Sequence, residues 1–499
     1  MTTTHPFLFA LAALPALSAH AAEPTAPLAG LENIKTVVVI YGENRSFDNL
    51  YGLFPGANGV ANATPDNGTV QKDRDGSVLA VLPPVWVSKK EKKGDKDAPP
   101  PKPAPDPLYP SGMPNAPFRL DAAPFNKPLT VPTRDLTHRY YQNQMQINGG
   151  KNDMFVAYTD AGALTMGHYD GAQLPLWQLA KQYTLADNFF MAAFGGSYMN
   201  HMWLACACTP LFADAPAKMR AQLDADGKLR TKPDSPAHAV DGPPRFYDGV
   251  LTPEGYTVNT VQSSYQPSGI APAKHGSKNL ANPDEHPLPP LTNKTIGDTL
   301  SDKQVSWAWY AGGYRAAQAD RKQIYGGSID YQPHHQPFNY YLRFAPGTRE
   351  RALHLKDETD LLRDIRRGSL PQVTFYKPPG TLNEHPGYSN VMQGDIHLAA
   401  LIAKLQASPQ WKQMAIIVTY DENGGFWDHV APPKGDRWGP GTRIPAIIIS
   451  PFAKRGFIDH TVYDTTSILQ FLTRRFNLEP LPGVRTQMGD LSNAFEFSK

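Results

Sequence analysis

The chain has 499 residues, of which 41% are hydrophobic and 19% are charged, and its formal net charge at pH 7 is +2. This composition excludes a disordered chain, and the small net charge gives no reason to expect a nucleic-acid partner. The 49 prolines and 22 tyrosines predict a loop-rich protein with aromatic surfaces.

The first residues have the pattern of a secretory signal peptide. Residues 7–17 form an apolar stretch that is too short to span a bilayer, and Ala19-His20-Ala21 fits the small-x-small rule for cleavage. The alternative, a buried first helix, lacks a capping residue. We therefore predict a signal peptide over residues 1–22 and a periplasmic or secreted protein. No later stretch is long enough for a transmembrane anchor.

Residues 34–44, IKTVVVIYGEN, predict the first strand. A continuous run of valine and isoleucine is typical of a strand that is buried on both faces, as in a parallel sheet. Ligands of such sheets bind at the carboxyl ends of the strands. This run places the oxygen-bearing side chains of Glu43 and Asn44 at that end, and the residues from Arg45 onward predict the start of a helix.

Two long segments interrupt the regular pattern, at about 58–128 and at about 210–290. Both are polar and rich in proline, and the first contains a charged run (KKEKKGDKD) followed by a proline run. We therefore expect extended or loop-like insertions. Between them, the pattern predicts a helix within residues 164–182 and a strand over 183–190.

The segment FGGSYMNH contains Ser197. Two preceding glycines let the backbone turn sharply and leave the hydroxyl exposed. The full GxSxG pattern of serine hydrolases is absent, but a metal can activate a serine hydroxyl without an adjacent base. The alternative is that Ser197 caps a helix that begins near Tyr198. The acidic strand ends elsewhere in the chain favour a nucleophile.

Cys206 and Cys208 lie two residues apart in HMWLACACTP. This spacing makes a disulfide between them unfavourable, and no second pair of cysteines is present to complete a soft metal site. We predict two buried thiols.

The last part of the chain alternates helical and extended patterns. The predicted elements are helices at 295–302, 359–367, 395–407 and 465–476, and strands at 305–310, 373–376, 414–420 and 444–449. Such alternation predicts an α/β fold, with a mostly parallel sheet and helices on both faces.

The stretch 414–423, MAIIVTYDEN, matches the first strand in pattern and ends with Asp421 and Glu422. An acidic hairpin turn is the alternative, but the preceding run is too apolar for one. Carboxylates from both strand ends would repel one another unless a cation neutralised them, and hard divalent cations prefer oxygen ligands. We predict a metal site between the strand ends. The length suggests two or three domains, but the two matching strands favour a single domain over residues 23–499.

Histidines are further candidates for this site. His334 and His335 (QPHHQPF) and His385 (NEHPGY) lie in loop-like segments, where functional groups tend to lie. Imidazolium groups bind phosphate oxygens and donate protons to leaving alkoxides near neutral or acidic pH. We predict that His354 and His460 are surface or packing residues. We predict that Asp395 lies in the N-terminal part of a helix.

Four motifs taken together resemble the bacterial phosphoesterase family: TVVVIYGENRSFDNLYG, GGSYMNH, NEHPGYSN and IIVTYDENGGFWDHV. That family contains secreted phospholipases C and respiratory-burst-inhibiting acid phosphatases. The motifs span nearly the whole chain after the predicted signal peptide. The resemblance implies an alkaline phosphatase-like fold, a mostly parallel central sheet flanked by helices on both faces, interrupted here by the two proline-rich insertions.

The resemblance also implies roles for individual residues. The implied metal ligands are Glu43, Asn44, Ser197, Asp421 and Glu422. The implied catalytic residues are Ser197 as nucleophile and His138, His335 and His385 in the phosphate pocket, with His334 beside them as a substrate-binding residue. His201 and His429 lie within matched motifs without an implied role.

The sequence around Ser197 is similar to that of the acid-phosphatase branch, whereas the phospholipase C branch tends to have threonine in a different local context. This predicts a secreted, metal-dependent acid phosphatase that cleaves phosphate monoesters through a phosphoserine intermediate. The alternative is a phospholipase C that cleaves phospholipid phosphodiesters. A third hypothesis is a catalytically silent surface-binding protein in which the acidic site holds a structural cation. The expected cofactor is one divalent ion: calcium, magnesium, manganese or zinc. Expected partners are phosphorylated small molecules or phospholipid head groups, without nucleic acid.

Overall fold

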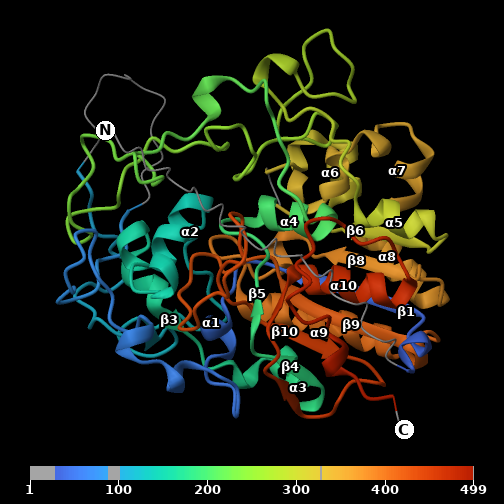
Figure 1. The fold of residues 1–499 in the computed structure, drawn as a ribbon, viewed down its shortest axis with the longest axis horizontal. Helices are drawn as coiled ribbons and strands as arrows, with labels where there is room; N and C mark the ends of the chain where they lie inside the picture. Colours follow the sequence, from blue (N-terminus) through green and yellow to red (C-terminus); the bar gives the residue numbers. More distant parts are fainter. Residues whose placement is uncertain (1–28, 88–101, 326–328, 498–499) are drawn as a thin grey trace, which may run out of the picture.

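A computed structural model of the protein describes residues 29–87, 102–325 and 329–497. The predicted signal peptide lies outside these residues. At the centre is an eight-stranded sheet with the order β11-β4-β10-β9-β1-β8-β6-β7 (Figure 1). Its strands are β1 (Thr36–Gly42), β4 (Thr184–Ala186), β6 (Trp307–Ala311), β7 (Leu355–Asp357), β8 (Val373–Lys377), β9 (Met414–Tyr420), β10 (Ala446–Ile449) and β11 (Phe457–Asp459).

The sheet is mostly parallel. Within it, β10 alone runs antiparallel to its neighbours β9 and β4, and the other pairs of adjacent strands are parallel. Two further pairs lie outside this sheet: β2 (Phe118–Arg119) with β3 (Gly167–His168), and β5 (Phe189–Phe190) with β12 (Tyr463–Asp464). The predicted fold class, an α/β protein built on a mostly parallel sheet, is confirmed.

The two matching apolar runs lie side by side as β1 and β9. Every residue of both strands is buried, as expected for continuous valine and isoleucine runs with helices on both faces. The pairing register joins Gly42 to Tyr420, the last residues of the two strands. Glu43 and Asp421 therefore leave the sheet next to each other.

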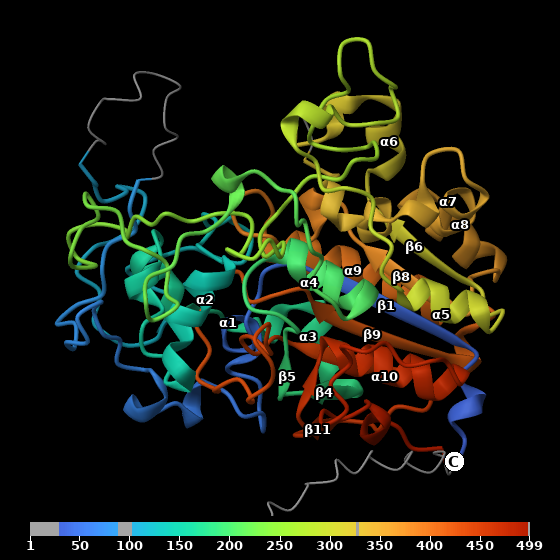
Figure 2. The ribbon, with the colours of Figure 1, turned by 45° about the horizontal axis from the view of Figure 1, so that its top comes forward.

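Helices cover both faces of the sheet (Figure 2). One group consists of α4 (Ser197–Cys206), α5 (Ile296–Asp302) and α10 (Thr465–Phe476), and the other consists of α3 (Pro175–Gln182), α8 (Glu358–Arg367) and α9 (Val391–Gln406). The remaining helices are α1 (Phe47–Tyr51), α2 (Tyr140–Ile147), α6 (Tyr314–Ala319) and α7 (Arg349–His354). No helix in the described part of the chain is long and apolar enough to cross a membrane.

Some predicted elements differ in extent. The strand expected over 183–190 is split into β4 and β5, and the helix within 164–182 is limited to α3, which begins at Pro175. Proline suits a first helical position because it lacks the N–H that would stay unpaired there. The described parts of the segments 58–128 and 210–290 contain mostly turns, isolated bridges and short 3₁₀ helices. Their status as insertions into one domain stays a prediction.

Asp395 has a different position from the one expected. Helix α9 begins at Val391, four residues earlier than Asp395, because the Asn390 side chain accepts a hydrogen bond from Gln393 N. The Asp395 carboxylate instead accepts a hydrogen bond from Leu176 N, 2.8 Å away, in the first turn of α3. It therefore supports the start of a neighbouring helix.

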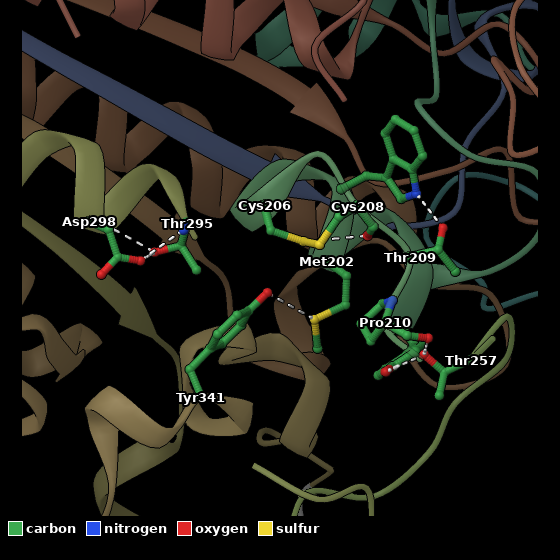
Figure 3. Close-up of a disulfide and its surroundings, with 11 residues drawn as sticks. Met202, Cys206, Cys208, Thr209, Pro210, Thr257, Thr295, Asp298 and Tyr341 are labelled. Atoms are coloured by element: carbon green, nitrogen blue, oxygen red, sulfur yellow. Dashed lines mark hydrogen bonds between the residues drawn. A yellow bond between two sulfur atoms is a disulfide. The ribbon is translucent and has the colours of Figure 1, made fainter. Parts of the chain in front are cut away.

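The prediction of two free thiols is wrong. Cys206 and Cys208 form a disulfide at the C-terminal end of α4 (Figure 3). Ala207 between them adopts the left-handed conformation, with φ of 47°, and its N–H bonds to Trp203 O. This turn brings the two Cα atoms to 5.1 Å, within the usual range for a disulfide. The sequence spacing did not reveal the turn.

Candidate active site

The carboxyl ends of β1 and β9 gather acidic and amide side chains in one buried cluster. Asn44 N donates a hydrogen bond to Asp421 Oδ1 at 3.1 Å, which ties the two strand ends together. Asn44 adopts the left-handed conformation (φ 60°), which asparagine tolerates better than most residues. Glu43, Asn44, Asp421 and Glu422 are all fully buried. The structure thus brings the predicted metal ligands together.

Glycines in the second motif allow this close packing. Gly424 has φ of 62°, and a Cβ atom there would lie 2.4 Å from Asn44 O. Any side chain would therefore push the loop after β9 away from the loop after β1. Gly424 N also donates a hydrogen bond to Glu422 Oε2 at 2.5 Å. The DENGG sequence positions the carboxylates through its backbone.

Ser197 joins the same cluster from helix α4. Its Oγ lies 3.3 Å from Asn44 Oδ1 and 3.5 Å from Glu422 Oε1. The N-cap position is Gly196, and the Ser197 hydroxyl makes no capping hydrogen bond, so the alternative role as a helix cap is not supported. Gly195 precedes it with φ of 93°, and a Cβ atom there would lie 2.6 Å from Tyr140 N.

The predicted histidines surround the cluster. His335 Nε2 lies 2.6 Å from Glu43 Oε1, His138 Nε2 lies 3.6 Å from Glu422 Oε1, and His385 Nε2 lies 3.1 Å from Asn44 Nδ2. His334 packs edge-on against His335, with ring centroids 4.8 Å apart. In His138 and His385, Nδ1 donates to a backbone carbonyl, which turns Nε2 towards the cluster.

Ser197 and three of these histidines, His138, His334 and His385, line a cleft with a volume of about 590 Å³. Its walls also carry Arg134, Arg139, Tyr325, Gln332 and Tyr388. The Tyr388 ring stacks on His385, with ring centroids 4.3 Å apart, and its hydroxyl donates a hydrogen bond to Glu43 Oε2 at 3.2 Å. Ser197 therefore lies in the wall of a cleft that can hold a polar ligand, and the buried Glu422 carboxylate lies 3.5 Å from its hydroxyl behind that wall.

The sequence did not predict one residue of the site, Lys377, and gave no role to another, His201. Lys377, the last residue of β8, is fully buried with Nζ 3.0 Å from Glu43 Oε1 and 3.6 Å from Asp421 Oδ2. The only signal in the sequence was a charge directly after the apolar run 373–376. His201 lies in α4, one turn after Ser197, and its Nδ1 donates to Ser197 O at 2.7 Å.

His429 belongs to a separate buried network. Its Nδ1 lies 2.6 Å from Asp48 Oδ2, and Arg443 bonds both Asp48 and Asp428 at 3.0 Å. These residues join the first turn of α1 to the loop after β9. Because Arg443 pairs with both aspartates inside the protein, we interpret this network as structural. The two histidines predicted to be surface or packing residues are placed accordingly, since His354 stacks on Trp307 and His460 is exposed beside Asp187.

Burial and charge shift the pKa values in the cluster. Burial raises the pKa of Glu422 well above its usual value and that of Asp421 to about 6. Burial acts in the same direction on Glu43, but Lys377 and His335 outweigh it and hold its pKa well below the usual range. Burial would lower the pKa of His138, but Glu422 and Asp135 raise it to about 9. Full ionisation of all three carboxylates therefore requires more positive charge than the cluster itself supplies.

These residues fit a divalent cation. Asp421 Oδ2 is a buried oxygen without a hydrogen bond, and Lys377 Nζ lies 3.6 Å from it. Groups of three potential ligands occur here, including Glu43 with His201 and Asp421, whose ligand atoms all lie within 4.8 Å of one another. Carboxylate and amide oxygens are ligands that hard divalent ions prefer.

The protein therefore has the architecture of an α/β enzyme. Its site consists of serine, acidic and histidine side chains at the carboxyl edge of a central sheet. The phosphoesterase family model matches residues 34–479. The chain therefore belongs to the phosphoesterase family, as the motifs predicted, and is a hydrolase that acts on phosphoric esters.

Among curated relatives, the chain is similar to phospholipase C B of Mycobacterium tuberculosis (strain ATCC 25618 / H37Rv), with 24% identity over 508 residues, covering 94% of this chain and 78% of that protein. It is also similar to the non-hemolytic phospholipase C of Pseudomonas aeruginosa, with 25% identity over 511 residues, covering 94% of this chain and 58% of that protein. Among solved structures it is similar to a protein in the alkaline phosphatase superfamily from Vibrio parahaemolyticus, with 11% identity, 75% of each chain covered and a TM-score of 0.32.

Proposed function

We propose that the protein is a metal-dependent phosphoric ester hydrolase in which Ser197 is the nucleophile. The observation that carries this proposal is the position of Ser197 Oγ. It lies at the first position of a ten-residue helix, 3.3 Å from Asn44 and 3.5 Å from Glu422, and it faces the cleft. The helix N-terminus favours negative charge near this hydroxyl.

Glu43, Asn44, Ser197, Asp421 and Glu422 would hold one divalent ion. When bound, the ion would supply Lewis acidity and lower the proton affinity of the serine hydroxyl. Without a cation, the carboxylates would repel the anionic phosphate group of the substrate, so metal binding and substrate binding are expected to depend on each other.

The residues of the chain then divide the reaction between them. Ser197 Oγ gives its proton to one of the neighbouring histidines and forms a bond to phosphorus, while the bond from phosphorus to the leaving ester oxygen breaks. A monoester leaves a phosphoserine, and a diester leaves a phosphodiester of Ser197. His138, His334, His335 and His385 supply N–H donors to the phosphoryl oxygens and a proton to the leaving alkoxide. Water then adds to phosphorus, the Ser197 hydroxyl is restored and phosphate or a phosphomonoester leaves.

The substrate class, phosphodiester or phosphomonoester, is the more specific part of the proposal. The relatives are named phospholipases C, and this supports cleavage of phospholipid phosphodiesters over the acid-phosphatase activity predicted from the sequence. The acid-phosphatase prediction depends on the FGGSYMNH segment around Ser197 alone. We therefore propose a phosphodiesterase of the phospholipase C type, with phosphomonoesters as the second candidate class. Secretion or a periplasmic location is part of the same proposal.

Hydrolysis of para-nitrophenyl phosphate and of para-nitrophenyl phosphorylcholine, at acid and neutral pH and with or without a chelator, tests this proposal. We expect chelator-sensitive hydrolysis of the choline diester, whereas preference for the monoester would assign the protein to the acid-phosphatase branch.

The Ser197→Ala variant should lose at least about a thousandfold in kcat, because it lacks the nucleophile. The matched control is Ser369→Ala, an exposed serine before β8, which should keep full activity. Full activity of Ser197→Ala, or an active protein that a chelator does not inhibit, would contradict the mechanism. A folded protein that hydrolyses neither ester would favour the hypothesis of a catalytically silent surface-binding protein.

A further inference from the structure

The mechanism above does not use the charge of Lys377. This residue ends β8, and the register pairs it with Ala311 of β6 and its neighbour Tyr376 with Ile40 of β1. The side chain is fully buried and does not line the cleft. Lys377 therefore lies behind the candidate metal ligands, where it cannot touch a substrate.

Three acceptors surround the ammonium group. Nζ lies 3.0 Å from Gly42 O, 3.0 Å from Glu43 Oε1 and 3.6 Å from Asp421 Oδ2. An ammonium group has three hydrogens to donate, so each acceptor can face one of them. The Tyr41 ring lies on another side, with its centroid 5.3 Å from Nζ. The side chain is thus held between the ends of β1 and β9.

Lys377 is the cation that lies between the carboxylates of Glu43 and Asp421. Glu43, Asp421 and Glu422 bring three negative charges into a site without solvent. One divalent ion compensates two of them, and the Lys377 ammonium compensates the third. Charges in such surroundings need compensation because the low effective dielectric makes an unpaired charge unfavourable. Without Lys377, the carboxylates of Glu43 and Asp421 would lack the cation that lies between them, because His138 faces Glu422 instead.

Potential ligands for a second ion are present around the same lysine. His201 uses Nδ1 to donate to Ser197 O, and its buried Nε2 has no hydrogen-bond partner. His334 Nδ1 and His335 Nδ1 also lack a hydrogen bond, whereas His335 Nε2 lies 2.6 Å from Glu43 Oε1. The ligand atoms of Glu43, His334 and His335 lie within 4.8 Å of one another. Two imidazoles and one carboxylate form a typical donor set for zinc.

We propose that Lys377 takes the place of a second divalent cation, and that its ammonium group restricts the site to one metal ion per chain. Glu43, His334 and His335 then form a latent second metal site, which the positive charge beside Glu43 keeps empty by repulsion. This inference rests on the proposed function, because it assumes that the carboxylates hold one ion.

Metal stoichiometry tests the inference directly. The full chain, its Lys377→Met variant and its Lys377→Gln variant are freed of metal with a chelator, dialysed against excess Zn²⁺ and then against buffer, and analysed by elemental mass spectrometry. Methionine and glutamine keep most of the volume of lysine without its charge. Lys404→Met, at an exposed position of α9, is the matched control. Circular dichroism and thermal melting show whether each protein is folded.

We expect one Zn²⁺ per chain in the wild type and in Lys404→Met, and two per chain in the Lys377 variants. Adding His335→Ala to Lys377→Met should return the count to one. One ion per chain in a folded Lys377→Met variant would overturn the inference. If both Lys377 variants fail to fold, titration of the wild type decides, because a second ion bound there despite Lys377 would also overturn it. A wild type that binds no metal would instead refute the proposed function.

Discussion

Asp395 offers a test of how burial controls the pH dependence of stability. Its carboxylate has one hydrogen bond, from Leu176 N, and its second oxygen is buried without a partner. Burial raises the pKa of Asp395 to about 7, from an ordinary value of 3.8. Replacement by asparagine keeps the shape and the acceptor for Leu176 N, but removes the charge. Asp395→Asn should therefore change stability by an amount that depends on pH.

The sign and the size follow from the two pKa values. Between about pH 4 and pH 7 the carboxyl is protonated in the folded protein and ionised in the unfolded chain, so the folded protein binds more protons and its stability falls as pH rises. A shift from 3.8 to about 7 corresponds to about 4 kcal/mol at 1.36 kcal/mol per pKa unit. The nearby Glu384, whose pKa is also raised by burial and then by Asp395, shares this penalty. We expect a net effect of about 2–4 kcal/mol.

Urea denaturation of the wild type and of Asp395→Asn, at one-unit steps from pH 4 to pH 8, measures the difference in the free energy of unfolding. The variant should gain about 2–4 kcal/mol relative to the wild type across this range, with the change complete above pH 7. The control is Asp284→Asn, which makes the same replacement at an exposed position. A difference for Asp395→Asn that stays constant within about 0.5 kcal/mol would refute the reasoning.

Two further predictions concern the supports of the site. Gly424→Ala should abolish metal binding and activity, because its Cβ atom would lie 2.4 Å from Asn44 O, whereas Gly227→Ala, with positive φ but open space around it, should keep both; equal metal content in the two variants would contradict this. Arg443→Met leaves two buried aspartates without their cation and should lower the free energy of unfolding by about 3–5 kcal/mol in urea denaturation. A loss below about 1 kcal/mol would show that the network is not structural.

The central strands could be predicted from the sequence because few structures other than a buried strand fit their pattern. A run such as MAIIVTY is apolar on both faces, and this requires burial between layers of helices. The acidic ends followed from the same pattern, since parallel strands end at one edge. For this reason the predicted site residues Glu43, Asn44, Asp421 and Glu422 lie together in the structure.

Other features depended on contacts that no local pattern encodes. The disulfide between Cys206 and Cys208 requires a left-handed residue between them, and the spacing alone argues against the bridge. Asp395 supports α3 through a contact between residues 219 positions apart. Tertiary packing decided both outcomes. Sequence periodicity reports which face of an element is buried, but not which partner will lie against it.

Lys377 shows this limit at the site itself. A lysine at the end of an apolar strand is expected to reach solvent, because its long stem can lie along the sheet while the ammonium group leaves it. Here β8 lies directly beside β1, and the register directs Nζ to Gly42 O and Glu43 Oε1. The ammonium group of Lys377 can be buried because the carboxylates compensate its charge. The carboxylates can be buried because the lysine compensates part of theirs. The charges of the two strands therefore depend on each other, and neither strand read alone predicts the site that they form.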